Sequence, residues 1–253
     1  MHIPLALQAA LWGLLAGGAL VVGAADAWFL KVPQRLIAAT MAFGSGVLIS
    51  ALAFELMDEA YQRGGFGSTA LGFLAGAKVY TGANWVLARY GAKHRKRAQG
   101  KQASNDDNSS SGMAIAVGAL LDGIPESIVI GLSLSQGGAV SLVTVIAIFL
   151  SNVPKGLSSA AGMKRTGRSA LYDFSVWTGI AAASGVASWF GYAVFRDVSA
   201  NTVAAATAVA TGAILAMLAD TMIPEAFEEA HDAAGLITVA GFLASFALTK
   251  LGG

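Results

Sequence analysis

Two polar patches interrupt the long apolar runs of this chain, and each has a proline near its centre. Residues 122–127 read Asp-Gly-Ile-Pro-Glu-Ser, and residues 151–156 read Ser-Asn-Val-Pro-Lys-Gly. Asp122 and Glu126 are four positions apart and therefore share one face of a helix, whereas the second patch carries the cation Lys155. A charge at the centre of a bilayer costs at least about 2.5–3.5 kcal/mol, so such residues normally face a cavity or a bundle interior and have partners. Here the carboxylates and the ammonium can serve as partners for each other.

Oxygen donors dominate both patches. Ser151 and Lys155 share a helix face by the same spacing, and Asn152 lies beside them. Each proline also removes a helical hydrogen bond, which frees carbonyl groups at membrane depth. Carboxylates, an amide and free carbonyls together are typical of a site for a hard or borderline divalent cation. The alternative is a buried ion pair of Asp122, Glu126 and Lys155 that fixes the register of two helices.

Three more acidic positions belong to other apolar runs. Asp220 lies deep in the run 201–226 and is predicted to be a metal ligand or proton acceptor, or else a helix-end charge. Glu55 ends another run and is predicted to lie in an outer mouth that concentrates cations, with an ordinary solvated helix end as the alternative. The acidic stretch 225–232 is expected to be a solvated loop, although it could also receive an exiting metal.

The composition is that of a polytopic membrane protein. Of 253 residues, 55% are hydrophobic, only 12% are charged and 31 are glycine. A soluble domain has about 25% charged residues, while abundant glycine allows helices to pack closely in lipid. The net charge of +1 gives no indication of nucleic-acid binding, and the absence of cysteine excludes disulfides and thiolate metal sites.

Eight apolar runs are long enough to cross the ~30 Å hydrocarbon core, which predicts an all-α bundle of eight transmembrane helices in one domain. A longer polar linker, residues 91–112, has the composition of a disordered segment. The runs lie near 5–30, 36–57, 66–90, 113–134, 139–163, 170–195, 201–226 and 233–251.

Basic residues favour one side of the membrane. The loops after the first, third and fifth runs are flanked by basic residues, against only Arg63, Arg196 and Lys250 on the other side. By the positive-inside rule these loops, including 91–112, are cytoplasmic, and both termini lie outside. The basic residues on the cytoplasmic side are Lys31, Arg35, Arg89, Lys93, Arg95, Lys96, Arg97, Lys101, Lys164, Arg165 and Arg168.

At these residues the chain resembles the ZIP (Zrt/Irt-like protein) family of divalent-metal transporters, over essentially its whole length. The segment 118–127 is similar to the family's fourth-helix motif, in which a His, an Asn two positions before the proline and a Glu after it bind metal. By that match Asp122 stands at the His position, Gly123 at the Asn position and Glu126 at the Glu position.

The resemblance extends to other spans. Ser151 and Asn152 stand where the family has polar ligands, and Lys155 stands where it has a second Glu that bridges two metals. On the seventh span Asp220 matches a neighbour of the metal site, and Thr221 takes the place of a further carboxylate ligand.

These departures remove ligands from the family's second metal position. The resemblance therefore implies a mononuclear midplane site, with the Lys155 ammonium in the space of the missing ion. Leu48 stands where some bacterial members have a Met ligand, and Glu55 falls at a polar entrance position. The expected metal ligands are Asp122, Glu126, Asn152 and Asp220, and the expected transport-path residues are Glu55, Ser151 and Lys155.

The function implied by this resemblance is import of Zn²⁺, or of a similar ion such as Fe²⁺, Mn²⁺ or Cd²⁺, into the cytoplasm. The implied fold is a 3+2+3 inverted-repeat bundle in the plasma membrane of a bacterium, and a homodimer is allowed. We expect no enzymatic reaction, no prosthetic group and no nucleic-acid partner. Two rival functions are a transport-inactive metal sensor or structural membrane protein locked by a Lys155 ion pair, and a cation-coupled carrier of a non-metal solute.

Overall fold

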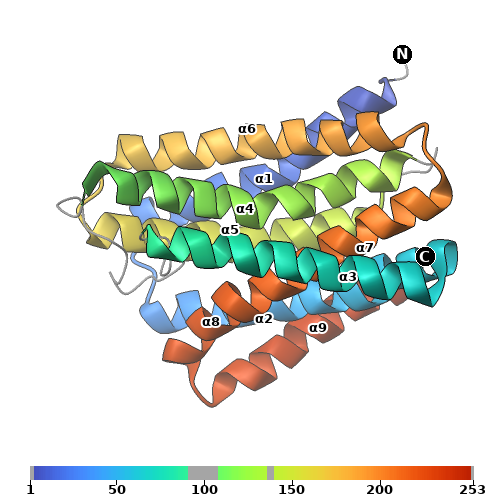
Figure 1. The fold of residues 1–253 in the computed structure, drawn as a ribbon. Coiled ribbons are helices and arrows are strands. Elements are labelled where there is room, and N and C mark those ends of the chain that lie inside the picture. The colour runs from blue at the N-terminus through green and yellow to red at the C-terminus, as the bar shows by residue number, and fades with distance from the viewer. Residues whose placement is uncertain (1–2, 91–107, 136–139, 252–253) are drawn as a thin grey trace.

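The predicted all-α class is confirmed over the part of the chain that the computed structural model describes. That part comprises residues 3–90, 108–135 and 140–251, and it contains helices and no strand. Its elements are α1 (Leu5–Phe29), α2 (Gln34–Ala51), η1 (Leu52–Leu56), α3 (Met57–Arg89), α4 (Asn108–Ser135), α5 (Leu142–Arg165), α6 (Ala170–Phe195), α7 (Ala200–Met217), η3 (Leu218–Met222), α8 (Ile223–Ala230) and α9 (Ala233–Leu251), where η1 and η3 are π-helical turns (Figure 1). The predicted linker 91–112 lies mostly outside the described residues.

Seven helices in the described part are long and apolar enough to cross a membrane. One of them, Gln34–Arg89, has 56 residues and would measure about 84 Å if straight, nearly three times the hydrocarbon core. It is not straight, because Gly65 has φ 69° and ψ 175°, a conformation that glycine adopts far more easily than other residues. Figure 1 shows the chain reversing direction there. The predicted eight spans include two in this segment, 36–57 and 66–90. The structure has it as one continuous helical segment, so seven helices are counted among the described residues.

Serine residues fix where three of the helices begin. The side chains of Ser141, Ser169 and Ser199 each accept a hydrogen bond from a backbone N–H in the first turn of the following helix. Such caps satisfy donors that have no partner within the helix. They set the first turns of α5, α6 and α7, and α5 carries the second polar patch.

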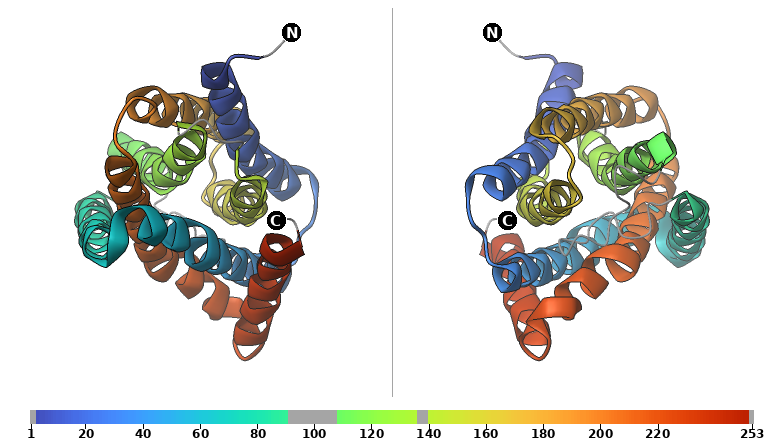
Figure 2. Two further views of the ribbon diagram at one scale, coloured as in Figure 1. Left: turned by 90° about the vertical axis from the view of Figure 1, so that its right-hand side faces the viewer. Right: turned by 90° about the vertical axis from the view of Figure 1, so that its left-hand side faces the viewer.

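The helices form two groups. In the first, which we call the α1 group, α1 packs along α5 and α6, and α4 packs along α6. In the second, the α2 group, α3 packs along α7, and α2 packs along α8 and α9. The groups occupy the upper and lower halves of the end-on views in Figure 2 and meet where α2 lies against α5 and α7 against α4. Both polar patches therefore belong to the α1 group, at its boundary with the α2 group.

Glycines let the helices within each group approach at backbone distance. A Cβ atom added at any of nine glycines would lie 1.8–2.7 Å from a carbonyl oxygen of the neighbouring helix, a distance that no real side chain tolerates. Small residues at helix contacts are the usual device for close packing in membranes. The contacts are Gly13 with Ser184, Gly23 with Val153, Gly156 with Leu20, Gly131 with Ser188, Gly191 with Ile128, Gly46 with Thr238, Gly212 with Phe73, Gly76 with Val209 and Gly241 with Phe43.

This packing predicts opposite effects for two glycine substitutions on α3. Gly76→Ala would place a Cβ 1.8 Å from the carbonyl oxygen of Val209, and we expect a loss of about 1–3 kcal/mol from overpacking. Gly82→Ala meets no atom within 4 Å and should be neutral or stabilising by up to about 1 kcal/mol, because alanine favours a helix. Thermal unfolding of the purified variants measures both effects. Equal melting temperatures for the two variants would contradict the described packing.

Candidate functional site

The centre of the site is a buried ion pair between α4 and α5. The ammonium of Lys155 contacts the carboxylate of Glu126 and also donates to Asn152 Oδ1 at 3.0 Å. The side chains of Lys155 and Glu126 are only 4% and 1% exposed. The amide nitrogen of Asn152 donates in turn to the backbone carbonyl of Ala16 at 2.9 Å, which ties the pair to α1. A cation is thus held by two side-chain oxygens inside the α1 group.

Asp122, the other carboxylate of the first patch, is bonded across the boundary between the groups. It is 3% exposed, and its Oδ1 accepts a hydrogen bond of 2.5 Å from the hydroxyl of Tyr80 on α3. Tyr80 is itself 1% exposed. Tyr80 was not among the predicted site residues. The one sequence feature that could have indicated it is a tyrosine within an apolar run, because a buried tyrosine usually finds a hydrogen-bond partner.

Glu225 is a second residue whose role the sequence analysis missed. The prediction of a solvated loop beginning at Glu225 was wrong, because α8 continues the helix to Ala230. Pro224 closely follows the π-helical turn η3, and the chain stays helical from Ala200 to Ala230. Glu225 is consequently buried, and its carboxylate accepts a hydrogen bond of 2.9 Å from Ser158 on α5.

A buried polar face of α5 connects these contacts. Its five residues are each at most 4% exposed, and they recur at the three- and four-residue spacing of one helix face. The face extends about 12 Å along the helix, from the proline turn to the contact with Glu225. The five residues are Ser151, Asn152, Lys155, Ser158 and Ser159. The predicted path residue Ser151 donates to the carbonyl of Ile148 in its own helix.

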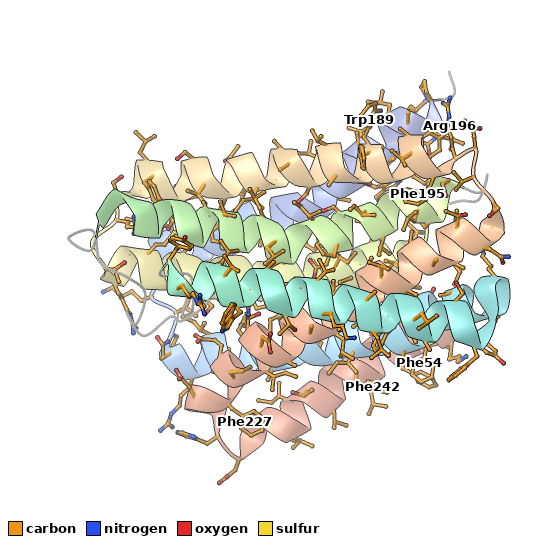
Figure 3. All side chains as sticks on the ribbon, in the orientation of Figure 1. Phe54, Trp189, Phe195, Arg196, Phe227 and Phe242 are labelled. Carbon is orange, nitrogen blue, oxygen red and sulfur yellow. The ribbon has the colours of Figure 1, made fainter. Side chains whose placement is uncertain are left out.

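The outside of the molecule is apolar in contrast. Trp189 on α6 and Phe227 on α8 are 46% and 54% exposed, and Figure 3 shows both on the periphery of the bundle. Phe54 is 38% exposed and packs against Phe242 with their ring centroids 5.8 Å apart. An apolar exterior around a polar interior is the arrangement that a bilayer requires.

Two predicted residues lie away from the ion pair. Asp220 is exposed in η3, where the amide of Asn84 approaches it at 3.4 Å. Glu55 is half-buried in η1, and the Ser141 hydroxyl lies 3.4 Å from its carboxylate. The π-helical turns change the rotation of the helix, so neither carboxylate follows the ordinary helical period.

The described side chains do not assemble the complete predicted ligand set. Within the described residues, no group of three or more Asp, Glu or His side chains lies close enough to hold a metal ion. Asp122, Glu126 and Asp220 therefore do not form such a group in this arrangement. What the structure brings together is Glu126, Asn152 and Lys155.

The fold and site define an all-helical protein with apolar helices of membrane-crossing length and a buried ion pair between two of them. Searches of family models and of curated proteins gave no match to the chain. Similarity to the ZIP family is therefore a prediction from the motifs alone.

The buried pair predicts strong coupling between Lys155 and Glu126. Removing one partner leaves a buried charge and should cost about 3–5 kcal/mol, whereas removing both should cost much less. We expect Lys155→Met and Glu126→Gln each to lower the melting temperature, and the double variant to recover part of the loss. Unfolding of all four proteins in one lipid gives the coupling energy. Lys78→Met, at an exposed position, is the matched control, and additive effects of the two site variants would contradict the pair.

Proposed function

We propose that the protein is an integral membrane transporter that carries a divalent metal cation, Zn²⁺ or a similar ion, into the cytoplasm. The observation that carries this proposal is the buried Lys155 ammonium, held by carboxylate and amide oxygens between two proline-containing helices. An ionisable residue inside a membrane helix is by default part of a functional site. The motif resemblance to the ZIP family supplies the expectation that the substrate is a metal.

The depth of the pair supports a transport site. Lys155 lies near the middle of the 24-residue helix α5, about 15 Å along the helix from its last residue. Stability alone accounts poorly for this placement, because well-packed apolar residues in place of a buried ion pair are often as stable or more stable. Substrate sites of transporters typically lie near the bilayer midplane, next to interrupted helices.

The oxygens that surround the Lys155 ammonium are of the kind that bind divalent cations. In this proposal Glu126 and Asn152 are ligands to the metal, together with Asp122 on the same helix face as Glu126. An arriving divalent ion 5 Å from the ammonium meets a repulsion of roughly 7 kcal/mol at an effective dielectric constant of about 20. The metal must therefore displace the ammonium, which predicts weak binding and fast release.

Asp220 would join the site only if η3 rotated inward, and a π-helical turn is a natural place for such a change.

A sequence repeat supports division of Gln34–Arg89 into two spans. The segments 42–60 and 208–226 are 166 positions apart and share Ala, Gly, Leu, Ala, Glu and Ala at equivalent positions. Both contain a π-helical turn at the same place, Leu52–Leu56 in the first and Leu218–Met222 in the second. We infer that span 2 and span 7 are copies of one element.

The packing partners support the same repeat. α2 packs along α9 as α7 packs along α3, and α1 packs along α5 as α6 packs along α4. The close contact of Gly46 with Thr238 has its counterpart in the contact of Gly212 with Phe73. These correspondences favour eight spans in a 3+2+3 inverted repeat. The distribution of basic residues separately favours both termini outside and the basic loops in the cytoplasm.

The division into two groups suggests how the site is exposed alternately to the two sides. The ion pair and the bond from Asn152 to Ala16 lie within the α1 group. The bonds from Tyr80 to Asp122 and from Ser158 to Glu225 cross to the α2 group, as does the longer contact of Ser141 with Glu55. Movement of one group past the other would break these crossing bonds and leave the ion pair and the bond from Asn152 to Ala16 in place. We propose the two shorter crossing bonds as latches of the described conformation.

A second candidate function follows from the same geometry. If Lys155 never leaves Glu126, the protein is a transport-inactive metal sensor or a structural membrane protein. The absence of a group of three metal-ligating side chains among the described residues favours this alternative. The third reading, a cation-coupled carrier of a non-metal solute, uses the same pair as its coupling site.

Metal uptake into proteoliposomes separates these functions. We expect wild-type protein to admit Zn²⁺, measured with a trapped zinc-sensitive dye. Asp122→Asn and Glu126→Gln should reduce uptake at least about tenfold, because each removes a charged ligand that contributes about 1.5–3 kcal/mol. Lys155→Gln should increase uptake, because it removes the repulsion that opposes the metal.

The matched control is Asp197→Asn, which changes an acid that is 80% exposed in a loop and should leave uptake unchanged. Size-exclusion profiles establish that each variant is folded. Zn²⁺, Fe²⁺, Mn²⁺ and Cd²⁺ fluxes through the wild type no greater than those of empty liposomes would contradict metal transport and favour the rival functions.

A further inference from the structure

A pocket at the end of α1 combines an apolar wall with basic side chains. Its volume is about 230 Å³, and it lies between the end of α1, the connection to α2 and the last turn of α5. The apolar wall includes Leu30 and Ile37. The basic residues that line the pocket are Lys31, Lys164 and Arg165.

The positive charge of this pocket is not neutralised by the described residues. No acidic residue lines the pocket, and within the described ranges none of its three basic side chains forms an ion pair. Lys164 donates to the carbonyls of Ala27 and Trp28 at 3.3 and 3.0 Å. These bonds hold its ammonium at the end of α1 and leave its positive charge in place. The pocket therefore offers three positive charges to an anion.

The pocket lies where a membrane helix meets water. Lys31 follows α1, and Lys164 and Arg165 end α5, and both helices are of membrane-crossing length and polarity. By the distribution of basic residues this end is expected to face the cytoplasm, where the leaflet is rich in anionic lipids. Basic pockets between helices at this depth are suited to phospholipid head groups.

We propose that this pocket binds the phosphate head group of an anionic phospholipid. The three basic residues contact the phosphate, and the wall that contains Leu30 and Ile37 receives the glycerol and the first methylenes of an acyl chain. A free phosphate ion would use the charges but leave the apolar wall without a partner, so a lipid fits the lining better. Because the pocket lies where α1 of one group leads to α2 of the other, the lipid bridges the two groups.

Lipid binding is measured on the purified full-length chain by native mass spectrometry. The probes are phosphatidylglycerol, which is anionic, and phosphatidylcholine, which carries the same phosphate without net charge. We expect the wild type to retain phosphatidylglycerol in preference to phosphatidylcholine. The double variant Lys31→Gln/Arg165→Gln should bind phosphatidylglycerol roughly twenty-fivefold more weakly, at about fivefold for each basic residue removed. Lys164 is left unchanged because it also caps α1.

The matched control is Arg35→Gln, an exposed basic residue at the same end that does not line the pocket. It should bind phosphatidylglycerol as the wild type does. Equal retention of the two lipids by the wild type would overturn the proposal even if the double variant failed to fold. Unchanged binding by a folded double variant would overturn it as well, and displacement of the lipid by millimolar inorganic phosphate would assign the pocket to a free anion. None of these outcomes depends on whether the protein transports metal.

Discussion

The structure depends on keeping one pair of opposite charges together where water is absent. Lys155 and Glu126 are almost completely buried near the middle of two helices, and either charge alone would cost several kcal/mol there. The attraction between the two charges offsets this cost only if α4 and α5 are held at a fixed distance. The bond from Asn152 to Ala16 provides part of this restraint, and the close glycine contacts of α1 with α5 and of α4 with α6 provide the rest.

The placement of the remaining polar groups follows from this constraint. The polar face of α5 cannot meet lipid, so it is enclosed between the groups. Lys155 and Asn152 contact α4 and α1. Ser158 meets Glu225 of the α2 group. Asp122 likewise meets Tyr80 at the boundary between the groups. The result is a pair that is secured within one group and bordered by hydrogen bonds to the other. Such an arrangement is compatible with both a moving transport site and a permanent lock, and the two differ only in whether the ammonium leaves its carboxylate.

The sequence predicted the elements of this site better than their arrangement. The helical class, most helix positions and a partner for Lys155 in the first patch follow from composition, periodicity and the cost of a buried charge. The outward direction of Asp220 did not follow, because Asp220 lies within a π-helical turn, which helical periodicity cannot reveal. The burial of Glu225 was missed because the acidic composition of 225–232 suggested a solvated loop, whereas α8 continues the helix to Ala230.

The proposed inverted repeat would relate the two patches differently from their prolines, which are 29 positions apart. Gly131 and Gly156, whose close contacts are with Ser188 and Leu20, are 25 positions apart. If these glycines are equivalent in the repeat, Glu126 corresponds to Ser151 and not to Lys155. The charged pair would then be made of positions that are not equivalent.

Calorimetric titration of the purified protein with Zn²⁺ tests the central claim most directly, namely that the Lys155 ammonium occupies a cation site. The account predicts at most one weakly bound metal per wild-type chain and tighter binding in Lys155→Glu, where a repelling charge becomes a ligand. Lys78→Glu, at an exposed position on α3, should bind as the wild type does. Two metals per wild-type chain, or weaker binding in Lys155→Glu than in the wild type, would contradict the claim.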